Sequence, residues 1–113
     1  MAFTDAALNA AVDGIAAAGS WISAHTADPV ATGTAQAGTR VQTTWGAAGS
    51  GATGGDRTGS QVSIGVAAGV TVTHWGLWSA TAAGTFLGGF ALGAPEAFGA
   101  AGNLLLTPTL DVD

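Results

Sequence analysis

Apolar residues alternate with small or polar residues along most of the chain after residue 20, and this two-residue period is the feature that most constrains the fold. The segment 61–66 (QVSIGV) alternates cleanly, and residues 41–45 (VQTTW) and 104–112 repeat the pattern. Successive side chains of a β-strand point to opposite faces, so alternation predicts strands with one buried face. Turn-forming residues separate these segments, as in an antiparallel sandwich. The sequence therefore predicts a mainly β fold, an antiparallel β-sandwich.

The first residues follow a longer period and predict one N-terminal α-helix over about residues 4–18. Thr4 is a suitable N-cap, and Gly19 marks the expected end of the helix. Between them, four apolar residues share one face at helical spacing: Leu8, Ala11, Val12 and Ile15. We expect this face to pack on a sandwich formed by about residues 20–113, so that the whole chain is a single structural domain.

Later segments add two more expected strands and indicate the place of the last one. Residues 70–79 are apolar on both sides, which indicates a central strand, or a strand with one face in the core and the other in an interface. A hairpin turn at 81–84 leads to a strand that begins at Phe86, and residues 93–103 are expected to form a loop. Pro108 cannot donate to a sheet, so the last strand is expected to be an edge strand or to contain a bulge.

Charge excludes several classes of function. The chain has no lysine and no cysteine, and its only arginines are Arg40 and Arg57, for a net charge of −5. A phosphate backbone requires a basic stripe, so we expect no nucleic-acid partner. The absence of cysteine excludes disulfides and thiolate metal sites, and we expect no metal and no cofactor. Charged residues are only 8% of the chain, which fits either a surface buried against partners or the codon bias of a GC-rich genome.

A membrane span and a signal peptide are both poorly supported. Residues 58–95 contain no Asp, Glu, Lys or Arg, but many Gly, Thr and Ser interrupt the apolar residues. This stretch alternates rather than running solidly apolar, so we expect no membrane segment. Residues 6–18 are alanine-rich, yet Asp13 lies among them and no basic region precedes them.

Candidate catalytic residues are few. His25 and Asp28 could be two ligands, or two members of a triad with a serine, but no nucleophile-elbow motif accompanies them. His74 is expected to be an interior or interface histidine that makes the assembly mildly acid-sensitive if it is buried. The glycine motif at 49–54 (GSGATG) is followed by a segment that does not start a helix, so dinucleotide binding is not supported. We therefore expect the protein not to be an enzyme.

Aromatic residues are the candidates for a partner interface. The simplest interpretation of the four tryptophans is core packing, but tryptophan is also enriched at interface hot spots and can stack on sugars. An outward tryptophan on strand 70–79, either Trp75 or Trp78, is the first candidate. Phe98, in a loop of glycine and alanine, is the second, because an exposed phenylalanine would otherwise lower solubility.

Four segments resemble a known family. They are residues 3–9 (FTDAALN), 22–29 (ISAHTADP), 72–78 (VTHWGLW) and 84–89 (GTFLGG). They are similar to small virion proteins of tailed phages and prophages of GC-rich, particularly actinobacterial, hosts. Such proteins are often labelled tail fibre or minor structural proteins, and similar β domains decorate capsids. The resemblance covers nearly the whole chain apart from residues 46–60. It implies a virion component and carries no catalytic motif.

These observations lead to two functional interpretations. The main one is a minor capsid or decoration protein that binds and stabilises the capsid lattice, with the major capsid protein or other virion proteins as partners. The alternative is a tail fibre or minor tail protein at the tail tip or in receptor binding. Either function fits a homo-oligomer, and a trimer would suit the three-fold axes of a capsid lattice.

Overall fold

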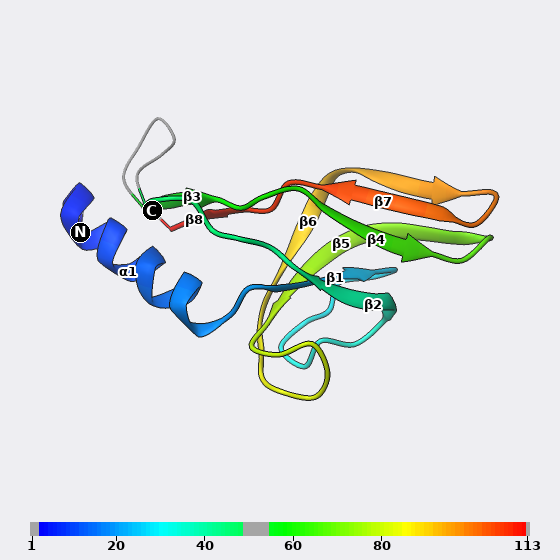
Figure 1. Ribbon diagram of the computed structural model, residues 1–113, viewed down its shortest axis with the longest axis horizontal. Coiled ribbons are helices and arrows are strands. Elements are labelled where there is room, and N and C mark those ends of the chain that lie inside the picture. Colours follow the sequence, from blue (N-terminus) through cyan, green and yellow to red (C-terminus); the bar gives the residue numbers. More distant parts are fainter. Residues whose placement is uncertain (1–2, 49–54, 113) are drawn as a thin grey trace.

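The computed structural model describes residues 3–48 and 55–112, in a molecule of 45 × 28 × 25 Å (Figure 1). The described residues form one helix and eight strands. In chain order these are α1 (Asp5–Ala18), β1 (Trp21–His25), β2 (Gln36–Gln42), β3 (Asp56–Thr58), β4 (Val62–Val66), β5 (Val70–Trp78), β6 (Phe86–Phe98), β7 (Gly102–Leu106) and β8 (Thr109–Asp111).

The strands form three antiparallel groups. A four-stranded sheet has the order β2-β1-β5-β6, and β4 pairs with β7 in a second layer that covers it (Figure 1). The short strands β3 and β8 pair with each other beside α1. The core lies between the layers and contains Ile22, Ile64, Val72, Leu77 and Leu104. The predicted mainly β, antiparallel sandwich with an N-terminal helix is confirmed.

The helix follows the prediction closely. Thr4 is the N-cap, and its side chain accepts a hydrogen bond from the backbone N–H of Ala7. Gly19 ends the helix in an extended conformation rather than a left-handed one. A Cβ on Gly19 would lie 2.5 Å from the carbonyl oxygen of Trp78, so close approach of β5 explains why glycine stands there. Val12 is the one fully buried residue of the helix.

Strand β4 and strand β5 also agree with their sequence patterns. In β4 the residues at positions 62, 64 and 66 are buried and those between them are exposed. In β5 the last four residues are all buried, whichever face they point to. Leu77 is buried in the hydrophobic core, whereas Trp78 is buried against Phe86 and Arg40.

Two strands extend into segments predicted as loops. Strand β2 begins at Gln36, inside a stretch expected to be irregular, because pairing with β1 supplies hydrogen bonds that local composition does not predict. Strand β6 continues to Phe98 through the expected loop at 93–103, despite Pro95. The register of β6 on β5 shifts between the partners of residues 72 and 74, so Pro95 lies in an irregularity and removes no ladder bond.

The C-terminal segment is divided at its proline. Pro108 separates β7, which pairs with β4, from β8, which pairs with β3. The last strand was expected to be an edge strand or to contain a bulge. Instead, the chain changes its partner strand at Pro108. Trp45, expected within a strand, forms only an isolated bridge with Gly59. Strand β3 lies within residues 46–60, the segment that the family resemblance does not cover.

Candidate functional site

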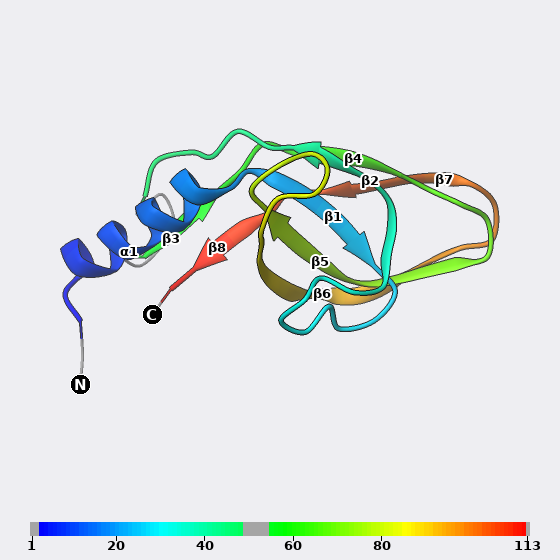
Figure 2. The same cartoon turned by 90° about the horizontal axis from the view of Figure 1, so that it is seen from below.

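Helix α1 and the β3–β8 pair gather at one end of the molecule, where both ends of the described chain also lie (Figure 2). This end differs from the sandwich in how it is held together. Polar contacts attach one side of the helix, and an apolar cleft lies along another side. Because a cleft between elements is the usual place for a binding site, we treat this end as the candidate functional site.

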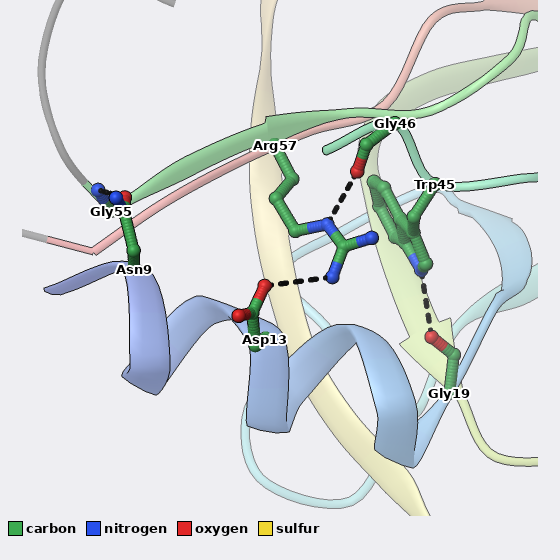
Figure 3. Close-up of polar contacts among 7 residues, drawn as sticks. All are labelled: Asn9, Asp13, Gly19, Trp45, Gly46, Gly55 and Arg57. Carbon is green, nitrogen blue, oxygen red and sulfur yellow. Dashed lines mark hydrogen bonds and ion pairs between the residues drawn. The ribbon is translucent and has the colours of Figure 1, made fainter. Parts of the chain in front are cut away.

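Arg57 makes the central polar contact of the helix (Figure 3). Its Nη1 donates to the Asp13 carboxylate at 3.0 Å, and its Nε donates to the carbonyl oxygen of Gly46 at 2.6 Å. Closer to the start of the helix, the Asn9 side-chain oxygen accepts from the backbone N–H of Gly55 at 2.8 Å. These contacts join α1 to β3 and to the segment that precedes it.

Trp45 holds the other end of the helix. Its indole Nε1 donates to the carbonyl oxygen of Gly19 at 2.9 Å, just beyond the last helical residue (Figure 3). The tryptophan is half-buried and packs against the core. Sequence reasoning did not single out Trp45 for this position, because the bond joins residues 26 apart.

An apolar cleft of about 350 Å³ lies beside the helix. Its helical wall consists of small residues and one isoleucine: Ala11, Gly14, Ile15 and Ala18. Its other walls come from β5, from β6 and from the C-terminal segment, with the apolar residues Leu77, Leu87, Phe90, Leu110 and Val112. The small residues of the helix leave this space unfilled, since a Cβ on Gly14 would meet no atom within 4 Å.

One carboxylate residue lines this cleft. Asp111 lines it and lies directly opposite Asp56 in the β3–β8 pair. Like charges opposite each other on paired strands are unfavourable, so this pair adds negative potential without adding stability. Oδ1 of Asp56 is buried without a hydrogen-bond partner. Among the described residues, no group of three or more His, Cys, Asp or Glu could hold a metal ion.

The predicted interface residues lie elsewhere. Trp75 is 5% exposed and stacks on Phe90 with ring centroids 4.3 Å apart, and Trp78 is 9% exposed. Neither tryptophan points outward in the folded chain, which corrects that expectation: Trp75 belongs to the hydrophobic core, and Trp78 packs against Phe86 and Arg40. Phe98 is half-buried at the end of β6 rather than in a loop. An interface role for Phe98 stays a prediction.

Trp78 instead belongs to a buried polar network. Its Nε1 donates to Oγ of Ser23 at 2.9 Å, and the same Oγ lies 2.6 Å from Nε2 of His25. Nδ1 of His25 lies 2.7 Å from the carbonyl oxygen of Thr34. An indole N–H can only donate and a carbonyl can only accept, so these partners assign the proton of neutral His25 to Nδ1. Ser23 then donates to Nε2.

Burial lowers the pKa of His25 below its ordinary value of 6.5. The hydrogen bond to the Thr34 carbonyl opposes this effect, and the nearby charges of His74 and Arg40 add to it. Asp28, the other candidate ligand, makes a separate contact, with its carboxylate accepting from the backbone N–H of Val30 at 2.9 Å. The structure shows His25 paired with Ser23 and enclosed in the interior.

The other candidates from the sequence lie away from the cleft or outside the described residues. His74, expected to be an interior or interface histidine, is half-buried, and its Nδ1 lies 2.8 Å from the hydroxyl of Thr73. The glycine motif at 49–54 lies outside the described residues. In the described part of the chain, no helix is long and apolar enough to cross a membrane.

Comparison with protein families gives one result. The model of a family described as Podophage GP4 fiber I protein gp80 matches residues 2–112 of this chain. A search of curated proteins and a search of solved structures found no significant match. The family match spans nearly the whole chain, including the helix, the sandwich and the cleft between them.

Proposed function

This chain belongs to the podophage GP4 fiber I protein family, and we propose that it serves as a fibre subunit on the tail of a tailed-phage virion. The observation that carries this proposal is the extent of the family match, which includes the sandwich and the helix together. A match limited to the sandwich would indicate only a widespread fold, because one fold serves many functions.

The family favours the fibre over capsid decoration. Decoration was the main interpretation of the sequence, and a tail fibre was its alternative. The family description names a fibre, so we adopt the alternative. The proposed activity is to bind other virion proteins, and we expect several copies of the chain in each fibre.

The burial and hydrogen bonding of the one serine–histidine pair in the described residues support binding rather than catalysis. A nucleophilic serine must reach its substrate, and its histidine must be free to take the proton. Ser23 and His25 are both fully buried, and both are committed to internal hydrogen bonds. We therefore assign this pair to folding of the β1–β5 region.

Glycan stacking by tryptophan, considered for a receptor-binding fibre, finds little support. A stacked sugar needs an exposed ring face, and Trp75 and Trp78 are buried. Trp21 and Trp45 are half-buried, and the indole N–H of Trp45 is already bonded to Gly19. We therefore propose that this domain contributes to building or attaching the fibre.

Immunogold labelling of intact particles tests the proposal. An antibody against the chain should label fibres on tails, and mass spectrometry of separated heads and tails should find the chain with tails. A decoration protein would instead be abundant on tail-less heads. Labelling spread over the capsid surface would overturn the fibre proposal in favour of decoration. Light scattering of the purified chain would measure the number of copies that associate, for which a trimer is one expectation.

A further inference from the structure

We propose that the apolar cleft beside α1 binds a basic segment of another virion protein, in which bulky apolar side chains are flanked by Lys or Arg. This inference rests on the proposed fibre function, because a fibre must be attached to a different component of the particle. It identifies the attachment point as the end of the molecule formed by α1, β3 and β8 (Figure 2).

The cleft has the size and lining that such a segment needs. A dry cavity of about 150 Å³ already accepts a benzene molecule, and this cleft measures about 350 Å³. It therefore has room for about two bulky side chains. Ile15 on the helix and Phe90 on β6 offer apolar contact from opposite walls. Gly14 leaves the helical side open, since no atom lies within 4 Å of the place where its Cβ would be.

Charge selects the kind of segment. Four of the seven acidic residues lie on the three elements at this end of the molecule: Asp5, Asp13, Asp56 and Asp111. Arg57 is the one basic residue there, so these elements carry an excess of three negative charges. Asp111 lines the cleft itself. Complementary charge steers partners and excludes like-charged ones, so an apolar cleft that Asp111 lines, at an end of the molecule with excess negative charge, favours a segment that contains Lys or Arg.

The charges of the chain also argue against a second copy as the occupant of the cleft. The chain contains no lysine, and both arginines are engaged by their own subunit. Arg57 binds Asp13, and Arg40 donates to two backbone carbonyls while its guanidinium lies 3.5 Å from the centroid of the Trp78 ring. A second copy would bring a net charge of −5 to this end of the molecule, and both of its arginines would already be engaged.

A synthetic peptide tests the chemistry directly. The probe is a short fluorescein-labelled amphipathic peptide of leucine and lysine, and its binding to the full chain is followed by fluorescence anisotropy. Two control peptides replace all lysines by glutamate or all leucines by serine. We expect the leucine–lysine peptide to bind at least about tenfold more tightly than either control. We also expect added salt to weaken it, because salt screens exposed charges.

Matched variants place the binding in the cleft. Gly14→Leu fills the open space and should weaken peptide binding by about tenfold or more. Ala17→Leu adds the same side chain at an exposed position of the same helix that does not line the cleft, and should leave affinity within about twofold. Asp111→Asn should weaken binding by about two- to fivefold, whereas Glu96→Gln, an equal change of charge on β6, should leave affinity unchanged.

Three results would overturn the inference. One is that the glutamate peptide binds as tightly as the leucine–lysine peptide. Another is that the Gly14→Leu variant binds the leucine–lysine peptide with unchanged affinity, although its wild-type unfolding temperature shows that it is folded. The third is self-association of the chain that Gly14→Leu abolishes, which would put a second copy in the cleft. The fibre proposal is decided separately by labelling of particles, so either conclusion can fail without the other.

Discussion

The hydroxyl of Ser23 lies 2.6 Å from Nε2 of His25, and both side chains, which come from β1, are fully buried. The same hydroxyl accepts the indole N–H of Trp78, which stands 55 residues later in the chain. One serine therefore joins a histidine of β1 to a tryptophan of β5. This network is closed to partners, and its effects should appear in stability.

Removing the shared hydroxyl should be costly. Ser23→Ala leaves Nε1 of Trp78 without its acceptor and Nε2 of His25 without its donor. Each buried polar group left unpaired costs about 1–3 kcal/mol, so with two such groups we expect the free energy of unfolding to fall by about 2–6 kcal/mol. Urea denaturation measures this change. Ser63→Ala, at an exposed position of β4, is the control and should change stability by less than about 0.5 kcal/mol. A loss of similar size in both variants would contradict the assignment.

Gly76 lies against this network, where there is no room for a side chain. A Cβ at this position would lie 2.7 Å from both Nε2 of His25 and Oγ of Ser23. We expect Gly76→Ala to destabilise the fold by about 1–3 kcal/mol, as overpacking of a core does. Gly14→Ala makes the same chemical change where nothing lies within 4 Å, and should stabilise the helix by about 0.5–1 kcal/mol. Opposite shifts in unfolding temperature would confirm both positions.

Acid should destabilise the protein through His25. Burial lowers the pKa of His25 below 6.5 in the folded chain, so the unfolded chain takes up its proton first as the pH falls. The unfolded state then binds more protons, and the free energy of unfolding decreases by up to about 1.4 kcal/mol per pH unit. This loss begins near pH 6.5 and stops once the pH passes below the lowered pKa. Thermal unfolding measured across this range checks the sign.

Two histidine variants separate the sources of this effect. His25→Gln should remove the loss between about pH 6.5 and the lower limit of the window. His74→Gln should retain most of it, because the charge of His74 makes only a secondary contribution to the pKa of His25. The sequence had indicated His74 as the acid-sensitive histidine. If His74→Gln abolished the acid dependence and His25→Gln did not, that earlier hypothesis would be restored.

Local patterns were sufficient to predict α1, β4 and β5. Thr4 supplies a cap from its own side chain, and the alternation from Val62 to Val66 reports a single buried face. The extents of β2 and β6 depend on distant partners instead. Gly38 has a φ of +77°, and a Cβ there would collide with the backbone of Gly65 on β4. Such contacts between strands cannot be read from residues that are neighbours in sequence.

The candidate site was harder to predict than the fold. Aromatic residues on β5 suggested an exposed face, but burial of Trp75 depends on Phe90 of the next strand. The cleft has walls from the beginning, the middle and the end of the chain, so no single segment predicts it. One signal was available: Gly14 and its small neighbours on the helix indicate a face that leaves space beside it.

The attachment of the helix should depend more on Arg57 than on Asp13. The two side chains form an ion pair of 3.0 Å, but that of Asp13 is 57% exposed and that of Arg57 only 18%. Exposed pairs contribute about 0.2–1 kcal/mol, so we expect Asp13→Asn to lower the free energy of unfolding by less than about 1 kcal/mol. Arg57→Ala also removes the hydrogen bond to the exposed Gly46 carbonyl and should cost about 1–2 kcal/mol. Hydrogen exchange of α1 amides gives a second measurement, because a loosened helix exchanges faster. If Arg57→Ala changed neither stability nor exchange of α1, the polar contacts in Figure 3 could not be what holds the helix beside the cleft.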